Sequence, residues 1–178
     1  MALGGFDIKN KRNAEKISSS GAGKPPSIGA LLAPELILSC PLQAGRKDFV
    51  GLLVARLCAA RGLGDPRPFL DRLSDREKGI STTLDSGLSV PHARMDGLPG
   101  FAAALGLVPR AMPDPDSEFP IRAVFVFFSP NRQDQFTAHL QLLRAAASLF
   151  STDFIDLILA DVRAEAVLRR ISEKEKAV

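Results

Sequence analysis

Two continuous runs of apolar residues restrict the folds open to this chain more than any other feature. Residues 101–108 (FAAALGLV) and 123–128 (AVFVFF) have the length of a strand, and the second run is rich in β-branched and aromatic side chains. A strand with one face in water alternates apolar and polar residues, whereas a strand buried on both faces is apolar throughout. The two runs therefore predict central strands of a sheet that helices cover on both sides.

Apolar residues at three- and four-residue spacing predict helices around these strands. Helices are expected at residues 46–61, 66–75, 137–150, 152–159 and 163–171. Gly62 ends the first helix, Thr152 or Asp153 can cap the fourth, and the proline-rich segment 109–120 is expected to be a loop. Helices followed by alternating strands and helices indicate an α/β fold: a three-layer α-β-α sandwich with a mixed sheet and helices on both faces.

The positive charge of the chain lies in its first 26 residues. They carry five basic and two acidic side chains, which equals the net charge of +3, so the remainder is neutral. Residues 18–26 (SSSGAGKPP) offer little apolar surface to offset the entropy lost on ordering. We therefore expect a disordered tail over residues 1–26, one domain over 27–178, and no nucleic acid as a partner of that neutral domain.

Several classes of protein are excluded by composition. No stretch approaches the ~18 apolar residues of a membrane span, and the N-terminus lacks the apolar region of a secretion signal. Cys40 and Cys58 form no CxxC pair, so neither a disulfide framework nor a zinc site is indicated. Both are expected to be half-buried thiols, and a reducing cytoplasm is the simplest location.

The chain has two histidines, and both have unusual neighbours. His92 follows Val90-Pro91, whose restricted backbone would present the imidazole from a rigid edge. An unprotonated imidazole can act as a nucleophile, a base or a ligand. His139 lies in the first turn of the helix 137–150, where free N–H groups favour an anion. On local context alone, surface histidines without a function remain the alternative.

Two other readings of the histidine region are disfavoured. Residues 87–91 (GLSVP) are similar to the Gly-x-Ser-x-Gly elbow of hydrolases, but Pro91 replaces the last glycine and no helical pattern follows Ser89. A metal site on His92 and His139 would need suitably arranged carboxylates, and no cluster with ligand spacing indicates them. We therefore predict no metal.

Residues 76–92 (REKGISTTLDSGLSVPH) resemble a known active-site signature. It is that of the fructose–mannitol type IIA domains of the bacterial phosphoenolpyruvate:sugar phosphotransferase system (PTS): Arg-Glu, Ser-Thr, a glycine, then an aliphatic residue and Pro-His. The resemblance extends over residues 28 to about 172, through Ala33-Pro34-Glu35, Pro120-Ile121 and His139-Leu140. An ordered set of motifs over that length is far more specific than one Pro-His pair.

The resemblance implies a phosphohistidine relay. His92 would accept a phosphoryl group from a small phosphocarrier protein, HPr or its nitrogen-branch homologue, and His139 beside it would orient the ring or stabilise the phosphate. Arg76 would balance the phosphate charge, since its planar guanidinium fits phosphate oxygens. Ser81 and Thr82 would donate further hydrogen bonds to phosphate. Such an arrangement implies no cofactor.

The chain departs from the family pattern in the loop before His92. Ile80 stands directly before Ser-Thr where the family usually has glycine, and the glycine-rich stretch that follows is replaced by residues 83–86 (TLDS). Asp85 also brings a negative charge towards a site that must hold phosphate. These changes bear on the conformation of the loop and on the transfer rate.

The resemblance also bears on the biological role. No IIB-like or membrane IIC-like segment is attached to the chain, which favours a likeness to the standalone nitrogen-regulatory IIA protein, whose phosphorylation state decides which regulatory target proteins it binds. The alternative is a sugar-specific IIA subunit that passes phosphate to a IIB domain. In either role we expect an apolar docking patch around His92, formed by Leu88, Met95 and Leu98.

Overall fold

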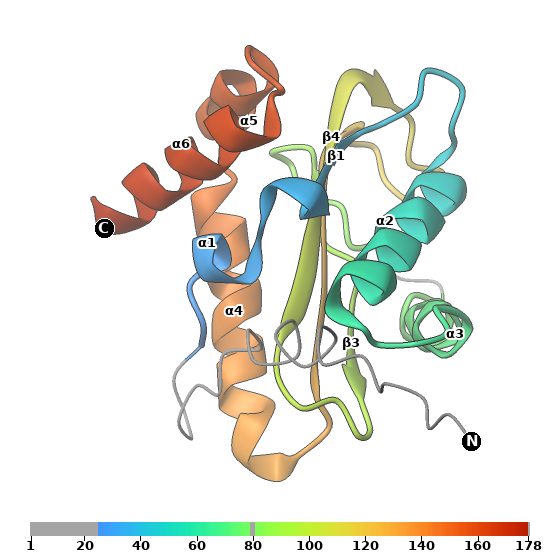
Figure 1. Ribbon diagram of the computed structural model, residues 1–178. Helices are drawn as coiled ribbons and strands as arrows, with labels where there is room; N and C mark the ends of the chain where they lie inside the picture. Colours follow the sequence, from blue (N-terminus) through green and yellow to red (C-terminus); the bar gives the residue numbers. More distant parts are fainter. Residues whose placement is uncertain (1–24, 79–80, 178) are drawn as a thin grey trace, which may run out of the picture.

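The fold described here is that of residues 25–78 and 81–177 in a computed structural model (Figure 1). The helices are α1 (Ile28–Leu31), α2 (Arg46–Arg61), α3 (Arg67–Arg76), α4 (Phe136–Leu149), α5 (Thr152–Leu159) and α6 (Ala164–Lys176), with 3-10 turns η3 (Pro34–Leu36) and η4 (Gln133–Gln135). The strands are β1 (Ile37–Ser39), β2 (Leu88–Ser89), β3 (His92–Met95), β4 (Ala102–Met112) and β5 (Ile121–Pro130). The disordered tail expected over residues 1–26 lies, up to residue 24, outside the described residues.

The strands form one mixed sheet in the order β1-β4-β5-β2, and β3 continues the β2 edge by also pairing with β5. β4 and β5 are antiparallel, whereas β1 runs parallel to β4 and both β2 and β3 run parallel to β5. The two apolar runs of the sequence are thus the central strands, and nearly all of their side chains are buried. This confirms the prediction that both of their faces are covered.

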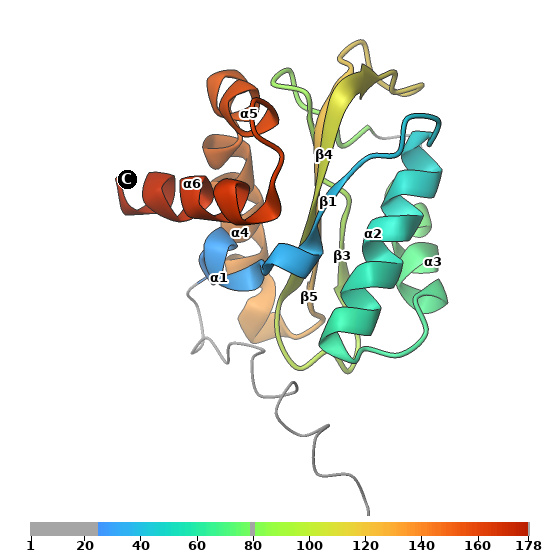
Figure 2. The same ribbon diagram turned by 45° about the horizontal axis from the view of Figure 1, so that its top comes forward.

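Helices lie on both faces of the sheet. Figure 2 shows α2 and α3 on one side, and α1, α4, α5 and α6 on the other. The three-layer sandwich is therefore confirmed, and helix α2 has the predicted bounds. Helix α6 continues to Lys176, beyond the expected end at residue 171. Cys40 is half-buried as expected, but Cys58 is fully buried.

The prediction of a loop from residue 109 is wrong for its first residues, because β4 continues through Pro109 to Met112. Proline cannot donate a hydrogen bond to a neighbouring strand. Pro109 is tolerated because it lies in the register irregularity between Leu107 and Met112, beyond the last pair with β1 at Leu107. A local irregularity in pairing leaves room for a residue that has no N–H.

The elements before α2 are too short to show a periodic pattern, and tertiary contacts hold them. The carboxylate of Glu175 on α6 accepts hydrogen bonds from the backbone N–H of Ile28 (2.6 Å) and of Gly29 (3.0 Å). It thereby satisfies two of the donors that a helix start leaves open. The first helix of the described chain is thus fixed to the last.

Substituting Gly106 with alanine is expected to destabilise the fold by about 1–3 kcal/mol, the usual cost of overpacking a core. A Cβ atom there would lie 2.5 Å from Cε1 of Phe49 and 2.9 Å from Cδ1 of Leu53, both fully buried. Gly51→Ala, at a helical position with open space around its Cβ, is the matched control and should be neutral or slightly stabilising. Urea denaturation of both variants checks the difference, and equal midpoints would contradict the packing argument.

Candidate active site

A pocket of about 350 Å³ opens beside His92, between the end of α3, the loop before β2, and α4. Its lining includes Arg76, Ser81, Thr82 and His92, four of the five site residues that the sequence singles out. The fifth, His139, is not part of the lining. Its ring lies next to that of His92, with the two centres 5.4 Å apart. The fold therefore brings all five predicted residues to one place.

The backbone sets the protonation of the His92 ring. Nδ1 lies 2.7 Å from the carbonyl oxygen of Val90, which can only accept a hydrogen bond, so Nδ1 carries the proton. In the neutral ring the lone pair is then on Nε2. The side chain is buried and stacks on Phe127, and this burial lowers the pKa of His92 from its usual 6.5, although the Val90 hydrogen bond opposes the shift. At neutral pH the arrangement provides an unprotonated nitrogen nucleophile.

His139 is held by a residue that the sequence analysis did not identify. Its Nδ1 lies 2.7 Å from Oγ of the fully buried Ser129, at the end of β5. Burial lowers the pKa of His139 to about 4, and the neighbouring His92, Arg94 and Arg76 add to this shift. His139 is therefore neutral at pH 7 and donates from only one of its nitrogens. The sole sequence signal for Ser129 is its place where the apolar strand ends.

The lowered pKa of His139 predicts how stability depends on pH. The pKa of His139 is near 6.5 in the unfolded chain and about 4 in the folded chain, so protonation favours the unfolded chain. The contribution of neutral His139 to the free energy of unfolding is therefore complete above pH 6.5 and decreases as the pH falls towards 4. We expect a loss of about 2 kcal/mol between pH 7.5 and pH 5 from this residue. His139→Gln should remove most of that slope in urea denaturation at the two pH values. An unchanged slope would contradict the assignment.

Arg76 is the last residue of α3 and is exposed at the mouth of the pocket. Among the described residues its guanidinium forms no ion pair or hydrogen bond. Its charge nevertheless reaches both rings, since it contributes to the lowered pKa of His92 and of His139. A cation held beside a neutral nucleophile, without a carboxylate to neutralise it, is suited to a phosphate that arrives at that nucleophile.

The hydroxyl groups of Ser81 and Thr82 are engaged with carboxylates. Ser81 Oγ donates to Oδ2 of Asp114 (3.1 Å), and Thr82 Oγ1 donates to Oε1 of Glu77 (3.0 Å). Both side chains line the pocket, but in this conformation their hydroxyl protons are directed at the carboxylates of Asp114 and Glu77. A role for them in phosphate binding would require the hydroxyls to turn, and it stays a prediction.

Asp114, which lies just after the C-terminal end of β4, holds the segment before His92 in place. This buried carboxylate accepts hydrogen bonds from Thr83 Oγ1 (2.6 Å), from Ser81 Oγ and from the N–H of Asp116 (3.0 Å). Burial opposes its ionisation, but these hydrogen bonds outweigh burial and lower the pKa of Asp114. The Thr83 side chain, one of the departures from the family pattern, is thus used to hold the loop.

Arg46 anchors the same segment from the other side. Its guanidinium forms a two-point ion pair with Glu77, at 2.7 and 3.1 Å, and also donates to Thr82 Oγ1 (3.2 Å). Glu77, the second residue of the Arg-Glu motif, is therefore neutralised by Arg46 and is not an unpaired charge near His92. Two-point pairs of this kind hold geometry as well as charge.

The remaining loop departures have separate outcomes. The Asp85 side chain is exposed and does not line the pocket, so its charge is not placed in the site. Leu84 lines the pocket. Gly87 has φ +84°, a backbone conformation that residues with a side chain rarely adopt. Its N–H donates to the carbonyl oxygen of Leu84 (2.9 Å), and this hydrogen bond closes a turn. The motif glycine is thus required by the turn that leads into β2.

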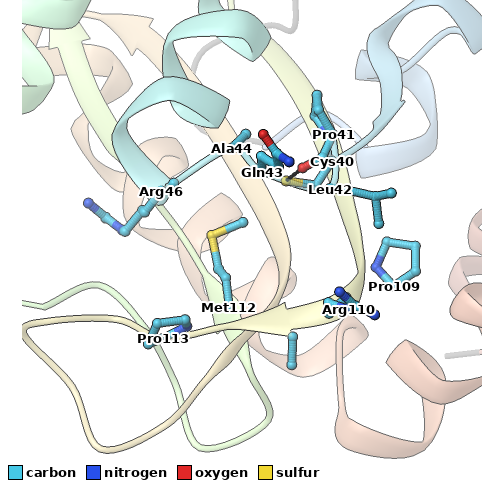
Figure 3. A pocket seen from close by; sticks show the side chains of 12 residues that line it. Cys40, Pro41, Leu42, Gln43, Ala44, Arg46, Pro109, Arg110, Met112 and Pro113 are labelled. Atoms are coloured by element: carbon cyan, nitrogen blue, oxygen red, sulfur yellow. Dashed lines mark hydrogen bonds between the residues drawn. The ribbon is translucent and has the colours of Figure 1, made fainter.

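Figure 3 shows a second, larger pocket, of about 530 Å³, whose lining includes neither histidine. It is formed by the β1–α2 loop, including Cys40 and Leu42, and by the end of β4, including Met112. Its lining is mainly apolar, and Arg46 is the only one of its residues that also takes part in the hydrogen bonds that hold the segment before His92.

In the described part of the chain, no group of three or more His, Cys, Asp or Glu side chains could hold a metal ion. No described helix is both long and apolar enough to cross a membrane.

The expected composition of the docking patch is wrong in two of three residues. Leu88 is fully buried in β2 and Leu98 is 8% exposed, while Met95 is half-buried. Leu88 pairs with Ala123 of β5 and so belongs to the sheet rather than to its surface. The apolar side chains that are exposed in this region come instead from the loop, at Leu84, and from α4.

Comparison with known families identifies the protein family to which this chain belongs. Residues 31–174 match the family described as phosphoenolpyruvate-dependent sugar phosphotransferase system, EIIA 2. The chain belongs to this family. As a PTS IIA domain it is a component of a phosphoryl-transfer system, which supports a phosphotransferase role in general terms. A comparison of the IIA domain with curated sequences finds no match.

Solved structures with the same fold include IIA domains with different roles. The nitrogen-regulatory protein IIA-Ntr from Neisseria meningitidis is 21% identical, with a TM-score of 0.70 over 81% of this chain and 98% of that one. IIA mannitol from Escherichia coli is 16% identical, with a TM-score of 0.59 over 79% and 98%. The same IIA in a complex with phosphorylated IIB mannitol is 15% identical, with a TM-score of 0.61 over 80% and 97%. At these identities the likeness establishes the fold of the IIA domain and not its specific role.

Proposed function

We propose that this IIA domain carries a phosphoryl group on Nε2 of His92, which it accepts from a small phosphocarrier protein. The observation that carries the proposal is the hydrogen bond from Nδ1 of His92 to the Val90 carbonyl oxygen, at 2.7 Å. It leaves the lone pair on Nε2 of a ring that lines a pocket with Arg76 at its mouth. Nε2 attacks phosphorus with its lone pair, which forms the new N–P bond, while the bond from phosphorus to the carrier nitrogen breaks and its electron pair returns to that nitrogen.

The neighbours of His92 then stabilise the charge on the transferred group. In the 2.7 Å contact between Ser129 Oγ and Nδ1 of His139 we assign the hydroxyl as the donor; the proton of that ring then lies on Nε2, which becomes a hydrogen-bond donor. Arg76 supplies a positive charge for the phosphate oxygens. Phosphoryl transfer depends chiefly on positioning and on charge stabilisation of this kind. In this proposal His139 and Arg76 supply the charge stabilisation, and the fixed ring of His92 supplies the positioning.

We further propose the nitrogen-regulatory role, in which phosphorylation changes the binding of regulatory target proteins. It is supported by the likeness to IIA-Ntr, which has the higher TM-score of the two named IIA domains. The second candidate is a sugar-specific IIA subunit that relays phosphate to a IIB domain. The likeness to IIA mannitol in its complex with phosphorylated IIB favours that candidate.

The relay is tested by incubating the protein with phosphoenolpyruvate, enzyme I and a phosphocarrier protein. Intact mass and peptide mapping should find one acid-labile phosphate on His92. Absence of phosphate with a carrier that phosphorylates another IIA domain would overturn the proposal. Adding IIB domains separates the two roles, because rapid transfer to one of them would favour the sugar-specific subunit.

A further inference from the structure

The outer face of α4 carries an apolar stripe beside the active-site pocket. Phe136, Leu140, Leu143 and Ala147 follow one another at four-, three- and four-residue spacing, so they share one side of the helix. Phe136 is 43% and Leu140 47% exposed, among the most exposed large apolar side chains in the described residues. The last three also line the His92 pocket. Together with Leu84, these residues form what we call the α4 patch.

Four arginines surround the α4 patch. Arg76 and Arg144 line the His92 pocket itself. Arg72 and Arg94 line a neighbouring depression between α3 and β3, outside that pocket. The guanidinium of Arg94 lies over the ring of Phe136, 5.1 Å from its centre, and Arg72 donates to the carbonyl of Arg94 (3.3 Å). The arginine rim thus extends well beyond the place where a phosphate on His92 would lie.

Asp85, next to Leu84, is exposed and has no cation partner among the described residues, but three other carboxylates of this region are paired with cations. In the part of the chain that the structure describes, Asp75 is the only carboxylate that lines either depression, and it lies 2.7 Å from Nζ of Lys78. Glu77 is neutralised by Arg46, and Asp134 is paired with Arg132. The surface around the α4 patch is therefore positive, although residues 27–178 are neutral as a whole. A concentration of one sign of charge at a functional mouth attracts a partner of the opposite sign.

We propose that the α4 patch and its arginine rim dock the protein that donates the phosphoryl group, and that the docking face of this donor has an apolar centre surrounded by acidic side chains. The inference rests on the proposed function and specifies its partner. An exposed apolar centre with a charged rim is the usual anatomy of a transient interface. Rim charges chiefly set the association rate and its dependence on salt. Because Arg72 and Arg94 lie outside the His92 pocket, phosphate binding alone does not account for them.

The test compares Arg72→Glu with Arg169→Glu, an equal change of charge at an exposed position on α6. Each variant and the wild type receives phosphate from two donors: a phosphocarrier protein, and phosphoramidate, a small P–N compound without a docking face that releases ammonia on transfer. With the carrier at low salt, Arg72→Glu should lower kcat/KM about tenfold through KM, and added salt should reduce the difference. Arg169→Glu should match the wild type, and all three should react equally with phosphoramidate.

Comparing the phosphocarrier protein with phosphoramidate distinguishes failure of the docking proposal from failure of the proposed function. Equal kcat/KM for Arg72→Glu and Arg169→Glu with the carrier, with normal labelling by phosphoramidate, would overturn the docking proposal and leave the relay intact. A rise in kcat/KM for Arg72→Glu would indicate a basic donor face and would also overturn it. No labelling of wild-type His92 by either donor would overturn the proposed function itself. Phe136→Asp provides a second check, since Phe136 belongs to the α4 patch but does not line the His92 pocket, and the variant should raise KM for the carrier alone.

Discussion

His92→Gln is expected to accept no detectable phosphate, a loss of at least ~10³-fold in rate, because it removes the nucleophilic nitrogen itself. Glutamine is similar in size to histidine and keeps a polar, uncharged side chain in the space of the ring, beside the Val90 carbonyl oxygen that Nδ1 of His92 contacts at 2.7 Å. The fold should therefore persist, and the melting temperature should change by a few degrees at most. Phosphorylation by phosphocarrier and by phosphoramidate, read as intact mass, measures the loss with and without docking.

A labelled His92→Gln protein would contradict the assignment of the nucleophile. His139 is the only other histidine in the sequence, so peptide mapping would show whether it had accepted the phosphate. A variant that fails to fold is recognised by its circular dichroism. His92→Asn, which places its amide nitrogen nearer to the position of Nδ1, then serves as the replacement.

His139→Ala is expected to lower the rate of phosphorylation about 10²-fold, the usual effect of removing one donor that stabilises a developing charge. The ring centre of His139 lies 5.4 Å from that of His92, and its Nε2–H is a donor that we assign to the transferred group. His139→Gln retains an N–H near the position of Nε2 and should recover about a tenth of the wild-type rate or more. Single-turnover measurements with phosphoramidate exclude effects on docking.

Equal rates for the Ala and Gln variants would mean that His139 acts by packing alone. Ser129→Ala separates these possibilities further. It leaves the ring in place but removes the hydroxyl 2.7 Å from Nδ1, so it should lower the rate several-fold only if the proton position of His139 matters. A stability measurement in urea accompanies each variant, since Ser129 is fully buried.

The sequence alone was sufficient for the layers of the fold and for the five residues, Arg76, Ser81, Thr82, His92 and His139, that the structure brings together. The apolar runs that became β4 and β5 could be recognised because burial on both faces is a local compositional property. Helix α2 was predicted with its observed bounds because apolar spacing and a terminal glycine are likewise local. The motifs around Arg76, His92 and His139 were recognisable by their order along the chain.

The tertiary structure alone decided how those residues are held. Ser129 with His139, Asp114 with Ser81 and Thr83, and Arg46 with Glu77 are contacts between residues 10, 33, 31 and 31 positions apart. A hydrogen bond between distant residues leaves no periodic pattern in the sequence. Exposure is decided in the same way: Leu88 and Leu98 are apolar like Leu140, yet only Leu140 reaches the surface. The type of a side chain determines which hydrogen bonds, charges and apolar contacts it can offer. The neighbours that folding brings to it determine which of these are formed.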